Sequence, residues 1–302
     1  MKDVLLMAVD LGTSFIKVGV YDTDSNCITV ETEPVKDYRP GPGIFIQKGE
    51  ELLASVIACM KKVCAALDKK AELIEAIAFT GQMSGFMGVD ENWNDITTWS
   101  CSLDNQYMPY AEKQMEKLRD PFLGIGGTNF PQMAPKYQWF KTEYPGESKK
   151  IAKYLMISGY VIGKLGDIPI EDAVIDRSFT QWTGLADVQN DRWSQEICRE
   201  IGLDEKYLPR IVNSNHICAN LNKEMAAATG LKPGIVLVSG AGDKPAGCLG
   251  AGIVNYGDTI FEASSYGEVS CCVSEYRPDM DERRLDVIPS AIPGEFYATH
   301  FA

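Results

Sequence analysis

Histidine, positive charge, long apolar runs and paired cysteines are all scarce in this sequence of 302 residues. His216 and His300 are its only histidines, which argues against a mechanism that needs a histidine base. Lysine and arginine total 29 against 42 aspartates and glutamates, a formal net charge of −13. Because such a chain has no cationic surplus with which to release counterions, we expect neither nucleic acid nor an anionic membrane as a main partner.

The cysteine pattern and the lack of long apolar runs indicate in which cellular compartment the protein works. The nine cysteines are scattered without a C-x-x-C pair, so neither a zinc site nor a disulfide framework is indicated, and reduced thiols suit a cytoplasmic protein. No apolar run approaches the roughly 18 residues of a membrane span. The first residues lead directly into a predicted strand, so we expect no signal peptide. These patterns together predict a cytoplasmic protein.

The composition is that of a packed protein, with 45% hydrophobic and 24% charged residues. A chain of this length suits two domains. A helix stop and a Pro-Gly break precede a buried strand predicted at 235–239, and we place the boundary there. The predicted domains are residues 1–233 and 234–302.

The opening segment has the pattern of a β-hairpin. An apolar run ends at Asp10, the small residues Gly12, Thr13 and Ser14 follow, and an alternating run leads away. The N–H groups and hydroxyls of such a turn can hold phosphate oxygens. Asp10 can hold a divalent cation through water, and Lys17 can add a point charge to a phosphate. An ordinary hairpin with a surface Asp and Lys is the alternative.

Periodicity indicates an α/β protein. A third strand (27–32), an amphipathic helix (50–67) and strands at 74–79 and 86–89 follow the hairpin. Helical spacing then dominates, with helices predicted at 135–143, 149–164, 191–201 and 224–228. A second hairpin, with strands at 259–263 and 268–273, echoes the first, so the two domains are expected to be related halves.

The most specific stretch runs from Ser239 to Gly252. A buried strand ends in Gly240, Gly242 and Asp243, and a helix of small residues follows. Glycines let the backbone approach a substrate closely, and a helix N-terminus favours an anionic phosphate. It is not a Rossmann motif, since Pro245 stands where the third glycine belongs, and no Gly-Lys-Ser/Thr of a Walker A loop occurs. A glycine-rich packing turn is the alternative.

Other polar stretches follow predicted strands. Gln82-Met83-Ser84 lies after a buried strand, with a plain turn as its alternative interpretation. Asp104 is a carboxylate with several lone pairs for hydrogen bonds from a ligand, or it could cap a helix. The stretch from Asp176 to Thr180 could line a cleft or serve structure alone.

Together these motifs resemble the FGGY carbohydrate kinases, the group that contains xylulokinase, gluconokinase and glycerol kinase. The segment from Asp10 to Ser14 with Lys17 is similar to the first phosphate loop of the actin/hexokinase superfold. Residues 239–252 are similar to the family pattern Gly-x-Gly-Asp-x-x-Ala-x-x-x-Gly-x-Gly, which carries the catalytic base. Ser264-Ser265 is similar to the second phosphate loop, where the family usually has Gly-Thr-Ser.

The resemblance implies an actin/hexokinase-like (ribonuclease H-like) α/β domain with a mixed sheet and flanking helices, plus the start of a second related domain. ATP and Mg²⁺ would lie between the domains, with Asp10 as the metal residue. Asp243 would be the general base, and we expect it to be ionised because an unperturbed Asp has a pKa of about 3.9. The nucleotide-binding residues would be Asp10, Gly12, Thr13, Ser14, Lys17, Ser264 and Ser265, and the sugar-binding residues Gln82, Met83, Ser84, Asp104, Asp243 and Lys244.

The chain departs from the family pattern at several positions. Where xylulokinases have Gln-Met-His-Gly and glycerol kinase has an Arg-Glu pair, this chain has Met83 and Ser84, which argues against glycerol. The Arg of the family's Asp-x-Arg is Gln106 here. Lys244 stands where xylulokinase has Asn and glycerol kinase has Gln, so it could select a different substrate.

We therefore expect an ATP-dependent kinase that phosphorylates a hydroxyl of a small-molecule ketose or polyol, with a pentulose such as xylulose as the leading substrate. A non-catalytic, actin-like ATP-binding scaffold is the alternative. Family members are much longer and hold the adenine pocket in the C-terminal half of their second domain. Residues 1–302 are thus expected to be a truncated kinase, inactive alone, and a homodimer stays open.

Overall fold

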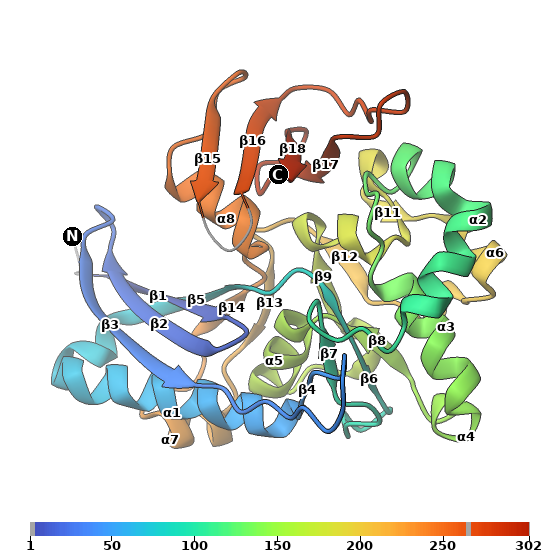
Figure 1. Ribbon diagram of the computed structural model, residues 1–302. Coiled ribbons are helices and arrows are strands. Elements are labelled where there is room, and N and C mark those ends of the chain that lie inside the picture. The colour runs from blue at the N-terminus through green and yellow to red at the C-terminus, as the bar shows by residue number, and fades with distance from the viewer. Residues whose placement is uncertain (1–3, 264–266, 302) are drawn as a thin grey trace.

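The computed structural model describes residues 4–263 and 267–301. Its N-terminal part is built on the strands β1 (Leu5–Leu11), β2 (Phe15–Asp22), β3 (Cys27–Pro34), β5 (Ile74–Gly81), β13 (Ile217–Asn220) and β14 (Val236–Val238). Within the described residues these six form one mixed sheet in the order β13-β14-β5-β1-β2-β3 (Figure 1). Strand β5 runs parallel to β1 and to β14, and the other neighbours are antiparallel. The predicted opening hairpin and third strand are confirmed.

Helices α1 (Gly49–Leu67), α5 (Ile157–Gly166) and α7 (Lys223–Thr229) lie on one side of this sheet (Figure 1). In α1 the side chains of Leu52, Val56, Met60 and Val63 are fully buried. Their spacing of three and four residues places them on one helix face, and burying each is worth about 1.5–3 kcal/mol. No helix in the described part of the chain is long and apolar enough to cross a membrane.

The middle of the chain forms a second, smaller layer. A four-stranded sheet has the order β4-β7-β6-β8, and β9 pairs with β12 and β10 with β11 among the described residues. The strands are β4 (Ile46–Gln47), β6 (Gly85–Val89), β7 (Trp99–Cys101), β8 (Lys153–Leu155), β9 (Val174–Asp176), β10 (Ala186–Asp187), β11 (Arg192–Trp193) and β12 (Arg210–Val212). The helices are α2 (Met108–Gly124), α3 (Met133–Glu143), α4 (Pro145–Ser148) and α6 (Gln195–Ile201). Short 3-10 helices cover Asp68–Leu73, Ile170–Asp172, Arg177–Phe179, Gln181–Thr183, Val188–Asn190 and Glu205–Tyr207.

The predicted helix at 149–164 is wrong in its first half. Residues 153–155 form β8, which pairs antiparallel with β6, and helix α5 begins only at Ile157. The neighbouring side chains of Tyr154 and Leu155 are both buried, as a strand covered on two faces requires. Pairing with a distant strand overrides the helical spacing here.

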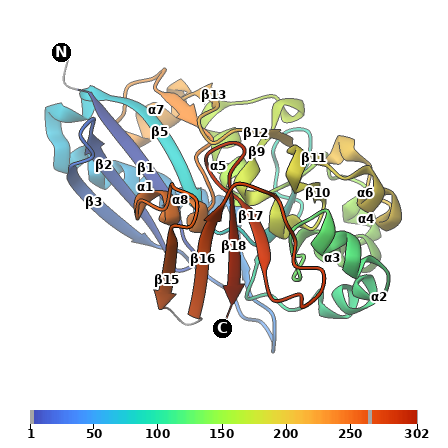
Figure 2. The same ribbon diagram turned by 90° about the horizontal axis from the view of Figure 1, so that it is seen from above.

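The C-terminal part consists of α8 (Asp243–Gly250), β15 (Thr259–Ala263), β16 (Gly267–Val273), β17 (Asp286–Pro289) and β18 (Phe296–Phe301). Its strands form an antiparallel sheet in the order β15-β16-β18-β17 within the described residues. Figure 2 shows them side by side, with α8 over the first sheet. The predicted strand pair at 259–263 and 268–273 is confirmed.

The predicted domain boundary at 233/234 needs correction. Strand β14, expected to open the second domain, pairs in parallel with β5 and completes the first sheet. Backbone hydrogen bonding therefore assigns it to the N-terminal part. The change from one part to the other lies after β14, in residues 239–242, and α8 is the first element of the second part.

Candidate active site

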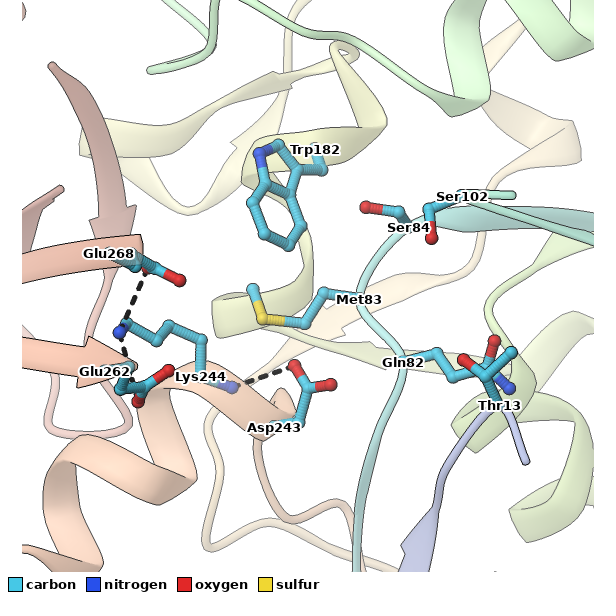
Figure 3. A pocket seen from close by; sticks show the side chains of 10 residues that line it. All are labelled: Thr13, Gln82, Met83, Ser84, Ser102, Trp182, Asp243, Lys244, Glu262 and Glu268. Atoms are coloured by element: carbon cyan, nitrogen blue, oxygen red, sulfur yellow. Dashed lines mark hydrogen bonds and ion pairs between the residues drawn. The ribbon is translucent and has the colours of Figure 1, made fainter. Parts of the chain in front are cut away.

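A cavity of about 340 Å³ lies where the turns after β1 and β5 meet the start of α8 and the strands β15 and β16 (Figure 3). Its lining comes from both parts of the chain. Six of the residues singled out in the sequence line it together: Thr13, Gln82, Met83, Ser84, Asp243 and Lys244.

The turn between β1 and β2 is held in a fixed shape beside this cavity. The Gln47 side chain donates a hydrogen bond from Nε2 to the Thr13 carbonyl oxygen, 2.8 Å away. A Cβ atom added at Gly12 would lie 2.6 Å from the Phe15 carbonyl oxygen, so only glycine fits there. The turn thus has the tight backbone that the sequence predicts, with Thr13 at the cavity.

Asp10 and Lys17 do not point separately toward a ligand. Lys17 Nζ lies 2.9 Å from Asp10 Oδ2, in an ion pair whose lysine side chain is exposed and whose aspartate side chain is partly buried. The described residues contain no group of three or more His, Cys, Asp or Glu placed to hold a metal ion. Because Mg²⁺ usually keeps several waters and takes one or two carboxylates, Asp10 fits a water-mediated contact to that ion.

The loop before α8 is packed so closely that it needs its glycines. Gly240 has a φ of +71°, and a Cβ there would lie 1.8 Å from the Phe79 carbonyl oxygen of β5. A Cβ at Gly242 would lie 2.6 Å from the Met83 side chain. These contacts bring the residue that follows, Asp243, to the wall of the cavity.

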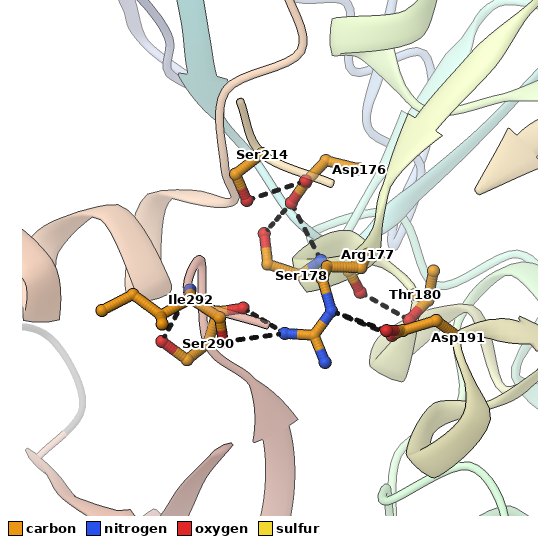
Figure 4. A network of polar contacts seen from close by, with 8 residues as sticks. All are labelled: Asp176, Arg177, Ser178, Thr180, Asp191, Ser214, Ser290 and Ile292. Atoms are coloured by element: carbon orange, nitrogen blue, oxygen red, sulfur yellow. Dashed lines mark hydrogen bonds and ion pairs between the residues drawn. The ribbon is translucent and has the colours of Figure 1, made fainter. Parts of the chain in front are cut away.

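A network behind this loop fixes its position (Figure 4). Ser178 Oγ accepts a hydrogen bond from the Gly242 N–H at 2.8 Å and donates one to Asp176. Ser214 Oγ donates to the other oxygen of Asp176 at 2.8 Å. Burial raises the pKa of Asp176 to about 6, against hydrogen bonds from Ser178 and Ser214 that lower it. Asp176 is thus a support of the loop, outside the cavity lining.

The acidity of Asp243 differs from the expected one. Its side chain is exposed to solvent where it lines the cavity, and many protein atoms surround it at longer range. Desolvation by these surrounding atoms is the largest cause that raises the pKa of Asp243 to about 7. A hydrogen bond from the Lys244 N–H, 2.8 Å long, lowers the pKa, whereas the negative charges of Asp10, Glu262 and Glu268 raise it further. Near neutral pH, Asp243 can both accept and release a proton.

Lys244 is a buried cation between two carboxylates. Its Nζ lies 3.0 Å from Glu268 Oε1 and 3.1 Å from Glu262 Oε1, and its side chain is 4% exposed. Burial by itself lowers the pKa of Lys244, but the hydrogen bonds and charges of Glu268 and Glu262 outweigh burial and raise it. Lys244 therefore stays positively charged and paired.

Gln82 lines the cavity and keeps one buried donor without a partner among the described residues. Its Oε1 accepts a hydrogen bond from Trp99 Nε1 at 3.2 Å, which fixes the orientation of the amide. Its Nε2 is buried and has no hydrogen-bond partner among the described residues. A buried donor without an acceptor is costly, so this amide fits a ligand oxygen in the cavity.

Asp104 does not join the other predicted residues. It is fully buried and lines a separate cavity. Its carboxylate accepts hydrogen bonds from Ser100 Oγ at 2.5 Å, Gln106 Nε2 at 3.0 Å and the Phe45 N–H at 3.3 Å. Its oxygens already have partners within the protein, and the predicted sugar contact of Asp104 stays a prediction.

Sequence reasoning missed four residues that line the cavity: Ser102, Trp182, Glu262 and Glu268. Trp182 lies across the cavity from Asp243 (Figure 3), and its ring contacts Phe301 of β18 with centroids 5.9 Å apart. The two glutamates could have been found from the sequence, because they lie opposite each other in the predicted second hairpin. The predicted phosphate-loop residues Ser264 and Ser265 lie outside the described residues.

Comparison with known proteins gives a consistent result. A model of the N-terminal domain of the FGGY family of carbohydrate kinases matches residues 5–250. A xylulose kinase of Bacillus subtilis is 24% identical over 268 residues, which are 87% of this chain and 52% of that protein. A gluconokinase of Bacillus subtilis is 25% identical over 281 residues, 92% of this chain and 53% of that protein. The chain thus spans about half the length of the curated relatives it matches.

Solved structures agree in fold. A xylulose kinase from Brucella ovis superimposes with a TM-score of 0.89 at 24% identity, covering 98% of this chain and 60% of that one. A glycerol kinase from Plasmodium falciparum, solved with ADP, also gives 0.89 at 16% identity, covering 99% of this chain and 61% of that one. These likenesses confirm the actin/hexokinase-like fold predicted for the chain.

Proposed function

The chain belongs to the FGGY family of carbohydrate kinases, and from this premise we propose that the whole protein transfers the γ-phosphate of ATP to a hydroxyl group of a ketose or polyol. A pentulose such as xylulose is the leading candidate, since a xylulose kinase is among the relatives. The observation that carries the proposal is the shared cavity, which Asp243 and Gln82 line together.

Asp243 is the general base in this proposal. A sugar hydroxyl attacks phosphorus as its proton leaves, and a carboxylate with a pKa of about 7 accepts that proton well at neutral pH. Phosphoryl transfer depends mainly on positioning and charge neutralisation, so help from a base is worth roughly 10²–10⁴-fold. The tight packing of Gly240 and Gly242 supports the positioning that this role requires.

The residues present suit a magnesium nucleotide. The closed turn at Gly12 and the hydroxyl of Thr13 offer donors to phosphate oxygens, and α8 begins at the same cavity. Asp10 would hold Mg²⁺ through water. When bound, the ion neutralises phosphate charge, which matters here because Asp10, Asp243, Glu262 and Glu268 make this region negative.

The acceptor would lie against the turn after β5. Gln82 Nε2 would donate to one of its oxygens, and Ser84 and Ser102 would contact its hydroxyls. Trp182 offers an aromatic face of the kind that packs on the carbon side of a sugar ring or chain. A non-catalytic scaffold would have no need of this set of donors.

A panel of neutral sugars and polyols, added to the whole protein with Mg²⁺ and ATP, tests the proposal by the release of ADP. We expect one ketose or polyol to raise ADP release far above the rate without acceptor. Asp243→Asn should cut kcat by at least ~10² and change acceptor affinity much less. No acceptor-dependent ADP release, or an Asp243→Asn variant with a tenth or more of wild-type kcat, would contradict the proposal.

A further inference from the structure

The ion pairs of Lys244 join α8 to both strands of the β15–β16 hairpin (Figure 3). Glu262 and Glu268 are directly opposite each other in this antiparallel pair. Like charges at opposite positions repel each other and destabilise a hairpin. The ammonium group of Lys244, within 3.1 Å of a carboxylate oxygen from each strand, offsets this repulsion. The three residues therefore form one unit, the Lys244 cluster, with a net charge of −1.

The Lys244 cluster decides the charge of the cavity. Among the described lining residues Lys244 is the only cation, and Asp243, Glu262 and Glu268 are the anions. The Lys244 side chain is only 4% exposed, and two carboxylates already neutralise its positive charge. A neutral acceptor meets the amide of Gln82 and hydroxyl groups. An acceptor with a carboxylate of its own would find no free cation and would face carboxylates.

We propose that the Lys244 cluster is a specificity-determining element that makes this site select uncharged polyhydroxy acceptors and reject aldonates, the sugar acids that carry a carboxylate. The inference rests on the proposed kinase function and narrows its substrate class. The relatives include both a xylulose kinase and a gluconokinase. The Lys244 cluster, a feature of this chain, favours the neutral sugar over the sugar acid as the acceptor. Rejection comes from repulsion by the carboxylates and from the lack of a free cation, because Lys244 is already paired.

The test frees the cation without removing it. In the double variant Glu262→Gln/Glu268→Gln, Lys244 loses both charged partners, and its ammonium group becomes available to a carboxylate in the cavity. We expect the ratio of kcat/KM for xylulose to kcat/KM for gluconate to fall at least ~10-fold from its wild-type value. The control Glu275→Gln/Glu282→Gln removes the same net charge from exposed positions outside the cavity lining, and the ratio should stay unchanged.

A second variant distinguishes the cation from a general change of charge. Adding Lys244→Gln to the double variant removes the freed ammonium group, so the selectivity for gluconate should fall to a value between those of the double variant and the wild type. Titration calorimetry with xylulose and with gluconate compares the binding affinities of the same variants for the two acceptors and requires no turnover. It therefore tests the inference even if ADP release shows the proposed kinase function to be wrong.

Two results would overturn the inference. One is a wild-type protein that binds or phosphorylates gluconate as well as the best neutral acceptor. The other is a double variant that circular dichroism shows to be folded and whose ratio of kcat/KM for xylulose to kcat/KM for gluconate equals that of the wild type.

Discussion

Asp243 combines two properties that a catalytic carboxylate needs, access to the cavity and a raised pKa. Its identity as the candidate base follows from the glycine-rich pattern around it, which is local in the sequence. Its acidity does not, because burial and the charges of Asp10, Glu262 and Glu268 come from distant segments. At the scale of single residues, the sequence indicates which group could act, and the fold determines at which pH it acts.

The pKa of Asp243 predicts how activity depends on pH. Below about pH 7 the carboxyl group is protonated and cannot accept the hydroxyl proton. We therefore expect kcat/KM of the whole protein to rise with pH and to level off above about 7, with a midpoint near the pKa of the free protein. Steady-state rates from pH 5 to 9 measure this, and the residual rate of Asp243→Asn should lack the rise. A midpoint near 4 would mean that Asp243 is an ordinary carboxylate.

The same pKa has a consequence for stability. Because the folded protein holds the proton more tightly than the unfolded chain, Asp243 contributes less stability as pH rises from about 4 to about 7. Asp243→Asn removes this dependence. The melting temperature of the variant relative to wild type should therefore increase across that pH window, a readout that requires no substrate.

At the scale of elements, the sequence predicted well those helices and strands whose apolar pattern lies within one segment. The hairpin β1–β2 and helix α1 have alternating or helical apolar spacing that matches their buried faces. The structure of segment 149–164 was predicted wrongly in its first half, because β8 forms through its pairing with the distant strand β6. The ion pairs of the Lys244 cluster were also not predicted. They join a helix to two strands, and the sequence does not reveal the register of those strands.

The loop between β14 and α8 provides a prediction at this scale. Gly240→Ala places a Cβ 1.8 Å from the Phe79 carbonyl oxygen, on a backbone with φ of +71°. We expect the free energy of unfolding to fall by at least ~2 kcal/mol, because the strand and the loop must move apart. Gly250→Ala is the control: a Cβ there meets nothing within 4 Å, so its effect should stay within ~0.5 kcal/mol. Urea unfolding compares the two, and equal losses would contradict the packing described.

At the scale of the whole molecule, two buried polar groups fasten the C-terminal part to the N-terminal part. Arg177 donates from Nη1 to the Ser290 and Ile292 carbonyl oxygens at 2.6 and 3.2 Å (Figure 4). Asp286 of β17 contacts a loop and a 3-10 helix of the other part. These contacts join residues more than a hundred positions apart, which no local pattern reveals. They also hold the β15–β18 sheet, and with it Glu262 and Glu268, over the cavity.

The contacts of Asp286 allow a direct test of this attachment. Asp286 is 2% exposed, and its carboxylate accepts hydrogen bonds from Thr128 Oγ1 and the Asn129 N–H at 3.0 Å and from Gln181 Nε2 at 2.8 Å. Asp286→Ala leaves these donors buried without an acceptor, so the free energy of unfolding should fall by about 3 kcal/mol or more. Asp281→Ala, an exposed aspartate on the same segment, should change it by less than ~0.5 kcal/mol.

Limited proteolysis then shows whether the lost stability lies between the two parts. If Asp286 fastens them, the variant should be cut faster in residues 239–242, which connect β14 to α8, at a urea concentration that leaves wild type intact. Asp286→Asn should rank between wild type and Asp286→Ala, because its amide keeps one acceptor oxygen but brings N–H groups toward other donors. An Asp286→Ala protein as stable as Asp281→Ala would mean that apolar packing alone joins the parts. The position of Glu262 and Glu268 over the cavity would then have to come from that packing.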